Sequence, residues 1–329
     1  MNRRRRLTIA LAALPCAPPL ALGQRRDKVW KVGFLSPRSR PPSMDADYYG
    51  AFRRTMRELG YVEGSNMVVE SRFAAGDYAR LPQMAAELVR LDVDVILALG
   101  PPGVAAAQKA TATIPIVFVV SADPVAFGFV KSLARPGGNV TGLFNLAGDL
   151  TKKQLEMLAA VVPNLSRVAV LVNPANAGHQ AVLADLALAT RHSAVRTIAF
   201  EATTRDLIGR AFRAIAGEKS EALIVGLDPL FIQEASEIAK RAKHQRLPSI
   251  SANREYAEAG GLLSYGQNQV DIYRRVAHYV DRIFKGARPA TMPVEQPTKL
   301  ELVVNGVTAK SLGIAIPPSL LARADNVIG

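Results

Sequence analysis

The sequence predicts an α/β protein with two halves, each built on a parallel β-sheet. Apolar runs of strand length alternate with amphipathic helical segments along most of the chain. Runs such as DVILAL and IPIVFVV are apolar on both faces, as strands covered by helices on both sides of a parallel sheet must be. The length of 329 residues suits about two domains of ~150 residues each. These observations predict two sheets, each with its own core.

The first 23 residues have the pattern of a signal peptide. MNRRRR is a positively charged start, LTIALAALPCAPPLAL is an apolar stretch, and Ala21-Leu22-Gly23 offers small residues at the spacing that a signal peptidase reads. The apolar stretch is too short and too rich in proline for a good membrane span. We therefore expect residues 1–23 to be cleaved near Gly23 and the mature chain to be exported.

Cysteine content and charge exclude several chemistries from the mature chain. Cys16, the only cysteine, lies within the predicted signal peptide, so disulfides, thiol catalysis and cysteine metal sites are excluded together. The formal net charge of +13 falls to +9 without the four arginines of that segment. The other basic residues are spread among acidic ones, and no zinc-finger, helix-turn-helix or RNP-like pattern is present. We expect a solvated basic surface and no nucleic-acid partner.

In the first half, four predicted strands alternate with three predicted helices. The first predicted helix places Tyr49, Phe52 and Met56 at helical spacing. Gly100-Pro101-Pro102-Gly103 separates the third strand from the third helix and is predicted to be a turn. The predicted strands are 30–36, 66–73, 93–99 and 114–120, and the predicted helices are 48–59, 81–88 and 104–110.

The alternation pauses at LARPGGNVTGLFNL, residues 133–146, where glycine and proline concentrate. We predict a second α/β half that begins near residue 142. Its predicted strands are 167–172, 194–200, 221–226, 247–250 and 261–265, and its predicted helices are 151–161, 177–190, 204–215 and 230–243. A long helix to about residue 285, an extended loop at 286–297, a strand at 300–304 and a helix at 308–312 follow. A lone helix and then a lone strand suit a chain that crosses back twice.

Small, polar and acidic residues recur where the predicted strands end. These ends are Ser36-Pro37, Gly100-Pro101-Pro102-Gly103, Ser121-Ala122-Asp123-Pro124, Asn173-Pro174, Gly226-Leu227-Asp228-Pro229 and Tyr265-Gly266. Each turn by itself suits an ordinary strand-to-helix connection, because proline is favoured at the first helical position. Ligands of open parallel sheets bind at the carboxyl ends of the strands. The recurrence of such turns therefore predicts a binding site at this edge.

Signatures of nucleotide binding and catalysis are missing from the sequence. It contains no GxGxxG that opens a helix, no GxxxxGK[ST] and no GxSxG. The four histidines, His179, His192, His244 and His278, have no partner at metal-ligand spacing and are predicted to lie on helix surfaces. Asp123 and Asp228 would suit an acid/base pair, but the sequence does not place them together. We expect no catalytic residue, no cofactor and no metal.

The sequence resembles the ABC transporter substrate-binding protein family sometimes called TrpX-like. The resemblance covers nearly the whole mature chain. Its most specific segments are ARPGGNVTG, LLSYGQN and KLELVVNGVTAKSLGIAIPPSLLARADNVI, with further matches at KVGFLSP, LVNPAN and FRRTMRELGYVEGSNMVVESRFAAGDYARLPQMAAELVRLDVDVILA. It implies a type I periplasmic binding protein fold, in which two Rossmann-like lobes with parallel sheets are joined by a hinge of three crossings.

The resemblance also implies the division of the chain and its partners. Residues 28–141 plus 267–293 would form lobe 1, and residues 142–266 plus 299–329 would form lobe 2. A small-molecule ligand would bind in the cleft between the lobes, and closure would present a surface to an ABC permease in the inner membrane. We expect a periplasmic monomer.

Ten residues are expected to bind the ligand: Ser36, Tyr48, Gly100, Gly103, Val104, Ser121, Asp123, Asn173, Asp228 and Tyr265. Backbone N–H groups at the helix starts after Gly100 and Ser121 suit a carboxylate. Asp228 suits an ammonium group, and Tyr48 suits a flat apolar part of the ligand. The leading ligand is an α-amino acid, aromatic or not, and the alternative is an aromatic carboxylate.

Two other functions are kept as alternatives. A ligand-sensing domain of a signalling system uses the same fold, although the sequence has neither a DNA-binding module nor a clear membrane span. A secreted enzyme on an α/β scaffold would turn over a small molecule and would lose that activity when Asp123 or Asp228 is changed.

Overall fold

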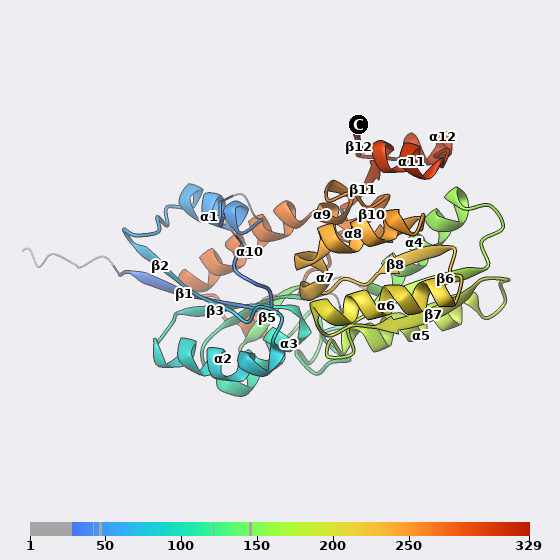
Figure 1. The fold of residues 1–329 in the computed structure, drawn as a ribbon. Coiled ribbons are helices and arrows are strands. Elements are labelled where there is room, and N and C mark those ends of the chain that lie inside the picture. Colours follow the sequence, from blue (N-terminus) through green and yellow to red (C-terminus); the bar gives the residue numbers. More distant parts are fainter. Residues whose placement is uncertain (1–27, 42, 46–47, 121, 145–146) are drawn as a thin grey trace, which may run out of the picture.

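Two sheets with helices on both faces lie side by side in the computed structural model (Figure 1). The structure describes residues 28–41, 43–45, 48–120, 122–144 and 147–329. The predicted signal peptide, 1–23, and Ser121 lie outside the described residues. The two mostly parallel sheets confirm the predicted α/β architecture.

The first lobe contains a five-stranded parallel sheet in the order β2-β1-β3-β4-β5. Its strands are β1 (Trp30–Ser36), β2 (Met67–Phe73), β3 (Val95–Leu99), β4 (Ile116–Val120) and β5 (Val140–Phe144). Helices α1 (Tyr48–Glu58) and α10 (Gln269–Phe284) pack on one face, and helices α2 (Leu81–Arg90) and α3 (Gly100–Ala110) pack on the other. A short 3₁₀ helix, Tyr78–Arg80, precedes α2. Each face therefore has its own apolar core.

The second lobe contains a seven-stranded sheet in the order β12-β11-β10-β9-β8-β6-β7. Its strands are β6 (Arg167–Val172), β7 (Arg196–Glu201), β8 (Ala222–Val225), β9 (Ser249–Ser251), β10 (Leu263–Gln267), β11 (Leu300–Asn305) and β12 (Asn326–Ile328). Its helices are α4 (Ala147–Val161), α5 (Gly178–Thr190), α6 (Arg205–Gly217), α7 (Pro229–Gln233), α8 (Ala235–His244), α9 (Arg254–Glu258), α11 (Gly306–Leu312) and α12 (Pro318–Leu321). Strand β11 runs antiparallel to β10, which departs from the predicted all-parallel sheet.

The segment predicted to be a pause contains a strand. Strand β5 pairs with β4 from Val140 to Phe144, so residues 142–144 belong to the first sheet and not to the second lobe. Gly142 lies at φ +153°, and a Cβ built there would sit 2.2 Å from the Phe118 carbonyl oxygen. The glycine that suggested a loop is required because the two strand backbones approach closely at this position.

Two predicted helices differ from the observed ones. Helix α3 begins at Gly100, four residues before the predicted start, so the two prolines form its first turn, where a missing N–H is tolerated. The predicted helix 230–243 is two helices, α7 and α8, that meet at Glu234. Helices α9 and α12 and strand β12, each three to five residues long, were not predicted because they are too short to show periodicity.

The chain returns to the first lobe through α10, whose apolar stripe packs against α1 and the first sheet (Figure 1). The extended segment after it runs beside β5, where Phe144 N–H donates to the Glu295 carbonyl at 3.0 Å. The Thr141 hydroxyl also donates to the Met292 carbonyl at 2.8 Å. The chain then enters the second sheet again as β11. The segment that leads from α10 back to the second lobe is thus held against β5 of the first sheet.

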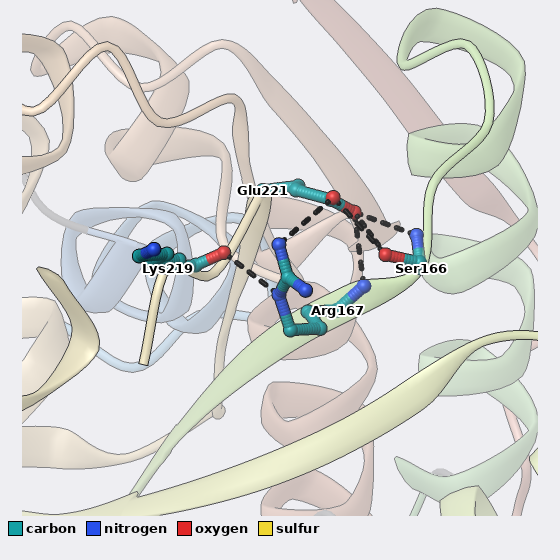
Figure 2. A network of polar contacts seen from close by, with 4 residues as sticks. All are labelled: Ser166, Arg167, Lys219 and Glu221. Atoms are coloured by element: carbon teal, nitrogen blue, oxygen red, sulfur yellow. Dashed lines mark hydrogen bonds and ion pairs between the residues drawn. The ribbon is translucent and has the colours of Figure 1, made fainter. Parts of the chain in front are cut away.

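Figure 2 shows how the amino ends of β6 and β8 are joined. The Glu221 carboxylate accepts hydrogen bonds from the Ser166 N–H at 2.6 Å and from the Arg167 N–H at 3.0 Å. The Ser166 hydroxyl lies 3.0 Å from both carboxylate oxygens, the Arg167 guanidinium donates to one of them at 3.3 Å, and Arg167 also donates to the Lys219 carbonyl. The backbone N–H groups of Ser166 and Arg167 lower the pKa of Glu221. The network lies at the sheet edge opposite the carboxyl ends of these strands.

No helix in the part of the chain described by the structure has both the length and the apolar content needed to cross a membrane.

We predict that Gly142→Ala destabilises the first lobe strongly. The new methyl group would overlap the Phe118 carbonyl, and the free energy of unfolding should fall by about 3 kcal/mol. Gly138→Ala is the control, because no atom lies within 4 Å of a Cβ at that position, and its unfolding free energy should change by less than about 0.5 kcal/mol. Urea unfolding of both variants measures the difference, and equal stabilities would contradict the close approach.

Candidate binding site between the lobes

One cavity lies where the carboxyl ends of strands from both sheets face each other. The space between its walls, including the part open to solvent, is about 1030 Å³. The first lobe contributes Ser36, Pro37, Arg38, Tyr48, Leu99, Gly100, Pro101, Val119, Gln269, Ile272 and Tyr273. The second lobe contributes Leu150, Thr151, Gln154, Asn176, Gly178, His179, Val182, Val225, Gly226, Leu227, Asp228, Pro229, Ile232, Ala252, Asn253 and Gln267.

Aromatic and aliphatic side chains form most of the first lobe's wall. The rings of Tyr48 and Tyr273 lie 4.6 Å apart between centroids at a tilt of 44°. The Arg38 guanidinium lies over the Tyr48 ring at 4.9 Å, a cation–π distance. Tyr49, the neighbour of Tyr48, is 3% exposed and packs into the core of the first lobe as predicted. This wall suits a flat apolar group next to an anionic one.

Asp228 is the buried polar centre of the second lobe's wall. Its side chain caps α7 by accepting from the Leu230 N–H at 2.9 Å. It also accepts from the Asn173 amide at 3.1 Å and from the Asn176 amide at 2.9 Å. The Tyr78 hydroxyl lies 3.1 and 3.0 Å from the two carboxylate oxygens. Because a carboxylate offers about four acceptor positions, Asp228 has none left for an ammonium group in this arrangement.

The Tyr78–Asp228 hydrogen bond joins the two lobes. Tyr78 belongs to the short 3₁₀ helix of the first lobe, and Asp228 follows β8 in the second. Burial, and next the Asp228 carboxylate, raise the pKa of Tyr78, so the hydroxyl remains a donor. A second bond crosses nearby, from the Ser39 N–H to the Gln233 side-chain oxygen at 3.3 Å. Both bonds require the lobes to lie close together.

His179 is held as a neutral imidazole on the cavity wall. Its Nδ1 accepts from the Asn173 N–H at 2.7 Å, so Nε2 carries the proton and faces the Leu227 carbonyl at 3.3 Å. Burial lowers the pKa of His179. The ring stacks on Phe231 with 6.1 Å between centroids. The prediction that His179 lies on a helix surface is wrong, because the residue is 4% exposed.

Asn253 lines the same cavity directly after β9. It is 2% exposed, and neither the nitrogen nor the oxygen of its side-chain amide has a partner among the described residues. A buried amide without partners is unfavourable, so this side chain calls for an explanation other than the contacts of the described residues.

The predicted binding residues fall into two groups in the structure. Ser36, Tyr48, Gly100 and Asp228 line the cavity, and Asn173 lies behind Asp228 and is hydrogen-bonded to it. The others that the structure describes, Gly103, Val104, Asp123 and Tyr265, are not among the lining residues. Ser121 cannot be placed, since it lies outside the described residues.

Each residue of the second group has another role. Val104 is fully buried in the core beneath α3, and Gly103 packs near the Leu35 carbonyl. Asp123 is exposed and accepts from the Val125 N–H at 2.8 Å, so it stabilises its own turn. Tyr265 lies within β10, which runs on to Gln267, and its carbonyl accepts from Gln154 at 3.0 Å. The sequence had suggested that a strand ends at Tyr265. This prediction is wrong, because the strand continues to Gln267.

The sequence offered a signal for some of the lining residues that were not predicted. Asn253 follows a strand end, as Asn173 and Asp228 do, and the same rule would have found it. His179 carried no such signal, because it reaches the cavity from helix α5, and neither did Tyr78, which contacts Asp228 from a short 3₁₀ helix. In the described part of the chain, no three histidine, cysteine or acidic side chains gather as a metal site would require.

Comparison with known proteins identifies a family whose sequence model matches most of the chain. The family model described as "ABC transporter substrate binding protein" matches residues 34–328. A tyrosine-binding protein from Clostridioides difficile is 25% identical over 271 residues, which are 82% of this chain and 77% of that protein.

Solved structures agree with this result. A conserved domain protein from Vibrio cholerae has a TM-score of 0.84 at 30% identity, covering 91% of this chain and all of that one. A Streptococcus pneumoniae ABC domain in complex with L-Trp has a TM-score of 0.82 at 24% identity, covering 91% and 99%. A ligand-free, open substrate-binding protein from Clostridium difficile has a TM-score of 0.64 at 26% identity, also covering 91% and 99%. The fold is thus that of type I periplasmic binding proteins.

We predict that acid destabilises the protein through His179. Its pKa is lowered in the folded state, so stability is complete above the unfolded value of about 6.5 and falls as the unfolded chain takes up a proton below it. Between pH 7 and pH 5 the unfolding free energy should fall more in the wild type than in His179→Gln. The exposed His192→Gln serves as control and should behave as the wild type does. Urea unfolding at the two pH values measures this.

We predict that Tyr78→Phe favours separation of the lobes. The substitution removes a hydrogen bond to a buried carboxylate, which contributes about 1.5–3 kcal/mol. The radius of gyration of the ligand-free protein in X-ray scattering should increase. Tyr61→Phe removes the matched bond to Asp281 at 3.1 Å inside the first lobe and should leave the radius unchanged. An equal radius for Tyr78→Phe and the wild type would contradict the role of the bond between the lobes.

Proposed function

This chain belongs to the family of ABC transporter substrate-binding proteins, and from that premise we propose that it captures an aromatic α-amino acid between its lobes for an ABC importer. The observation that supports this most is the composition of the cavity wall. Its charged side chains are Arg38 and Asp228, one of each sign, next to the neutral His179. A balanced pair next to aromatic rings suits a zwitterion with a flat side chain better than a simple ion.

The relatives support the same class of ligand. One curated relative is a tyrosine-binding protein, and one solved structure of the same fold holds L-Trp. In the proposed complex, Arg38 faces the carboxylate and Tyr48 stacks on the aromatic side chain. Asp228 contributes negative potential and, through Tyr78, favours closure of the lobes.

We further propose that the lobes close over the ligand. The chain superimposes better on the complex with L-Trp, at a TM-score of 0.82, than on the ligand-free open protein, at 0.64, although the identities are similar. The Tyr78 bond between the lobes supports a closed arrangement of this chain. Closure of this hinge type would bury the ligand and form a composite surface for the permease.

The location and partners in this proposal follow from the family and from the first 23 residues. The protein would be exported, cleaved near Gly23 and active in the periplasm as a monomer, with an ABC permease of the inner membrane as its partner. Binding alone, without chemical change of the ligand, would be its role.

We predict that L-tyrosine or L-tryptophan stabilises the mature protein against heat. At a concentration of one hundred times Kd, the gain should be about 2.7 kcal/mol, and calorimetric titration should give one site. Phenylpropanoate, an aromatic carboxylate without an ammonium group, is the comparison ligand. A shift with phenylpropanoate alone would favour the aromatic carboxylate alternative, and no shift with either amino acid at millimolar concentration would contradict the proposed function.

A further inference from the structure

Three asparagines lie directly before helices α9, α10 and α11. One of the three differs from the others. Asn268 precedes α10, and its side-chain oxygen accepts from the Asp271 N–H at 3.0 Å. Asn305 precedes α11, and its side-chain oxygen accepts from the Thr308 N–H at 2.8 Å. Both are ordinary capping residues.

Asn253 holds the same position before α9 without acting as a cap. Its side chain makes no capping bond, and the Tyr256 N–H is bonded to the Asn253 backbone carbonyl at 3.0 Å instead. The amides of Asn268 and Asn305 also donate, to Glu301 and to the Ala257 carbonyl. Both polar atoms of Asn253 are buried without a partner among the described residues. Helix capping therefore does not explain this asparagine.

Neighbouring polar groups on this wall already have partners. The Ser251 hydroxyl donates to the Val225 carbonyl at 3.2 Å, and the Gln267 amide donates to the Pro297 carbonyl at 2.8 Å. The Asp228 carboxylate is filled by its four partner groups. On this side of the cavity, Asn253 combines a free donor with a free acceptor.

We infer that Asn253 anchors the head group of the bound amino acid and distinguishes it from a plain carboxylate, an inference that rests on the proposed function. Its Nδ2 would donate to the ligand carboxylate, and its Oδ1 would accept from the ligand ammonium. A plain carboxylate would pair with Nδ2 alone and leave Oδ1 buried and unpaired. An amine without a carboxylate would leave Nδ2 unpaired. The amino-acid head group satisfies both atoms, so Asn253 acts as a specificity-determining residue.

The test compares Asn253→Leu with Asn305→Leu, a matched removal of a buried but fully paired amide. Titration calorimetry on the full mature protein uses L-tyrosine and its deamino analogue, 3-(4-hydroxyphenyl)propanoate. Asn253→Leu should raise the Kd of L-tyrosine by about tenfold or more. It should raise the Kd of the analogue by less than about threefold, so the preference for the amino acid should fall. Asn305→Leu should leave this preference unchanged.

The stability of the ligand-free protein gives a second readout that needs no ligand. Removing an unpaired buried amide should keep or raise the thermal midpoint in Asn253→Leu, whereas Asn305→Leu should lower it, because its two bonds are lost. A lowered midpoint in Asn253→Leu equal to that of Asn305→Leu would overturn the inference. Equal weakening of both ligands, or unchanged affinity for L-tyrosine, would also overturn it.

The two proposals fail in different ways. If the wild type binds neither ligand, the proposed function is overturned. If the wild type binds L-tyrosine and Asn253→Leu binds it equally well, only the role of Asn253 is overturned.

Discussion

The buried Asp228 carboxylate is the constraint on which the arrangement of the cavity depends. An ionised carboxylate at 0% exposure is tolerated only when hydrogen-bond donors replace its lost water. The second lobe supplies three of them, from Asn173, Asn176 and the start of α7, and the first lobe supplies the Tyr78 hydroxyl. Closing the cleft therefore completes the solvation of a charge that the second lobe alone leaves partly unsatisfied.

The same centre organises the residues around it. Asn173 donates to Asp228 through its side chain and to His179 through its backbone N–H. The second bond fixes the imidazole tautomer, and burial keeps the ring neutral. Among the described residues that line the cavity, the charged side chains are Asp228 and, on the facing wall, Arg38, next to the neutral His179 ring. A zwitterionic ligand, with one positive and one negative group, would suit these charges. It would not need to displace any hydrogen-bond partner of Asp228 or His179.

The sequence predicted the fold better than it predicted the site. Strands such as β1 and β6 match their apolar runs, because burial on both faces leaves little choice of residue. Strand β5 was missed since Gly142 is a loop signal locally but is required by contact with Phe118, a residue distant in sequence. At the site, the rule that ligands bind at strand ends found Asp228. It did not find the hydrogen bond from the Tyr78 hydroxyl to this carboxylate, because that contact joins residues 150 positions apart.

Two opposing features of the closed cleft argue that ligand and closure are coupled. The Tyr78–Asp228 bond favours the closed arrangement, and the Asn253 amide is buried there without a partner among the described residues. We propose that opening the cleft breaks the Tyr78 bond and lets water reach Asn253. A ligand that pairs with Asn253 would remove the penalty of the unpaired amide, while the Tyr78–Asp228 bond would remain. Such a ligand would bind the closed state more tightly than the open one, as a population shift requires. On this proposal, the ligands that close the lobes are those that satisfy the Asn253 amide, and recognition and closure depend on the same side chain.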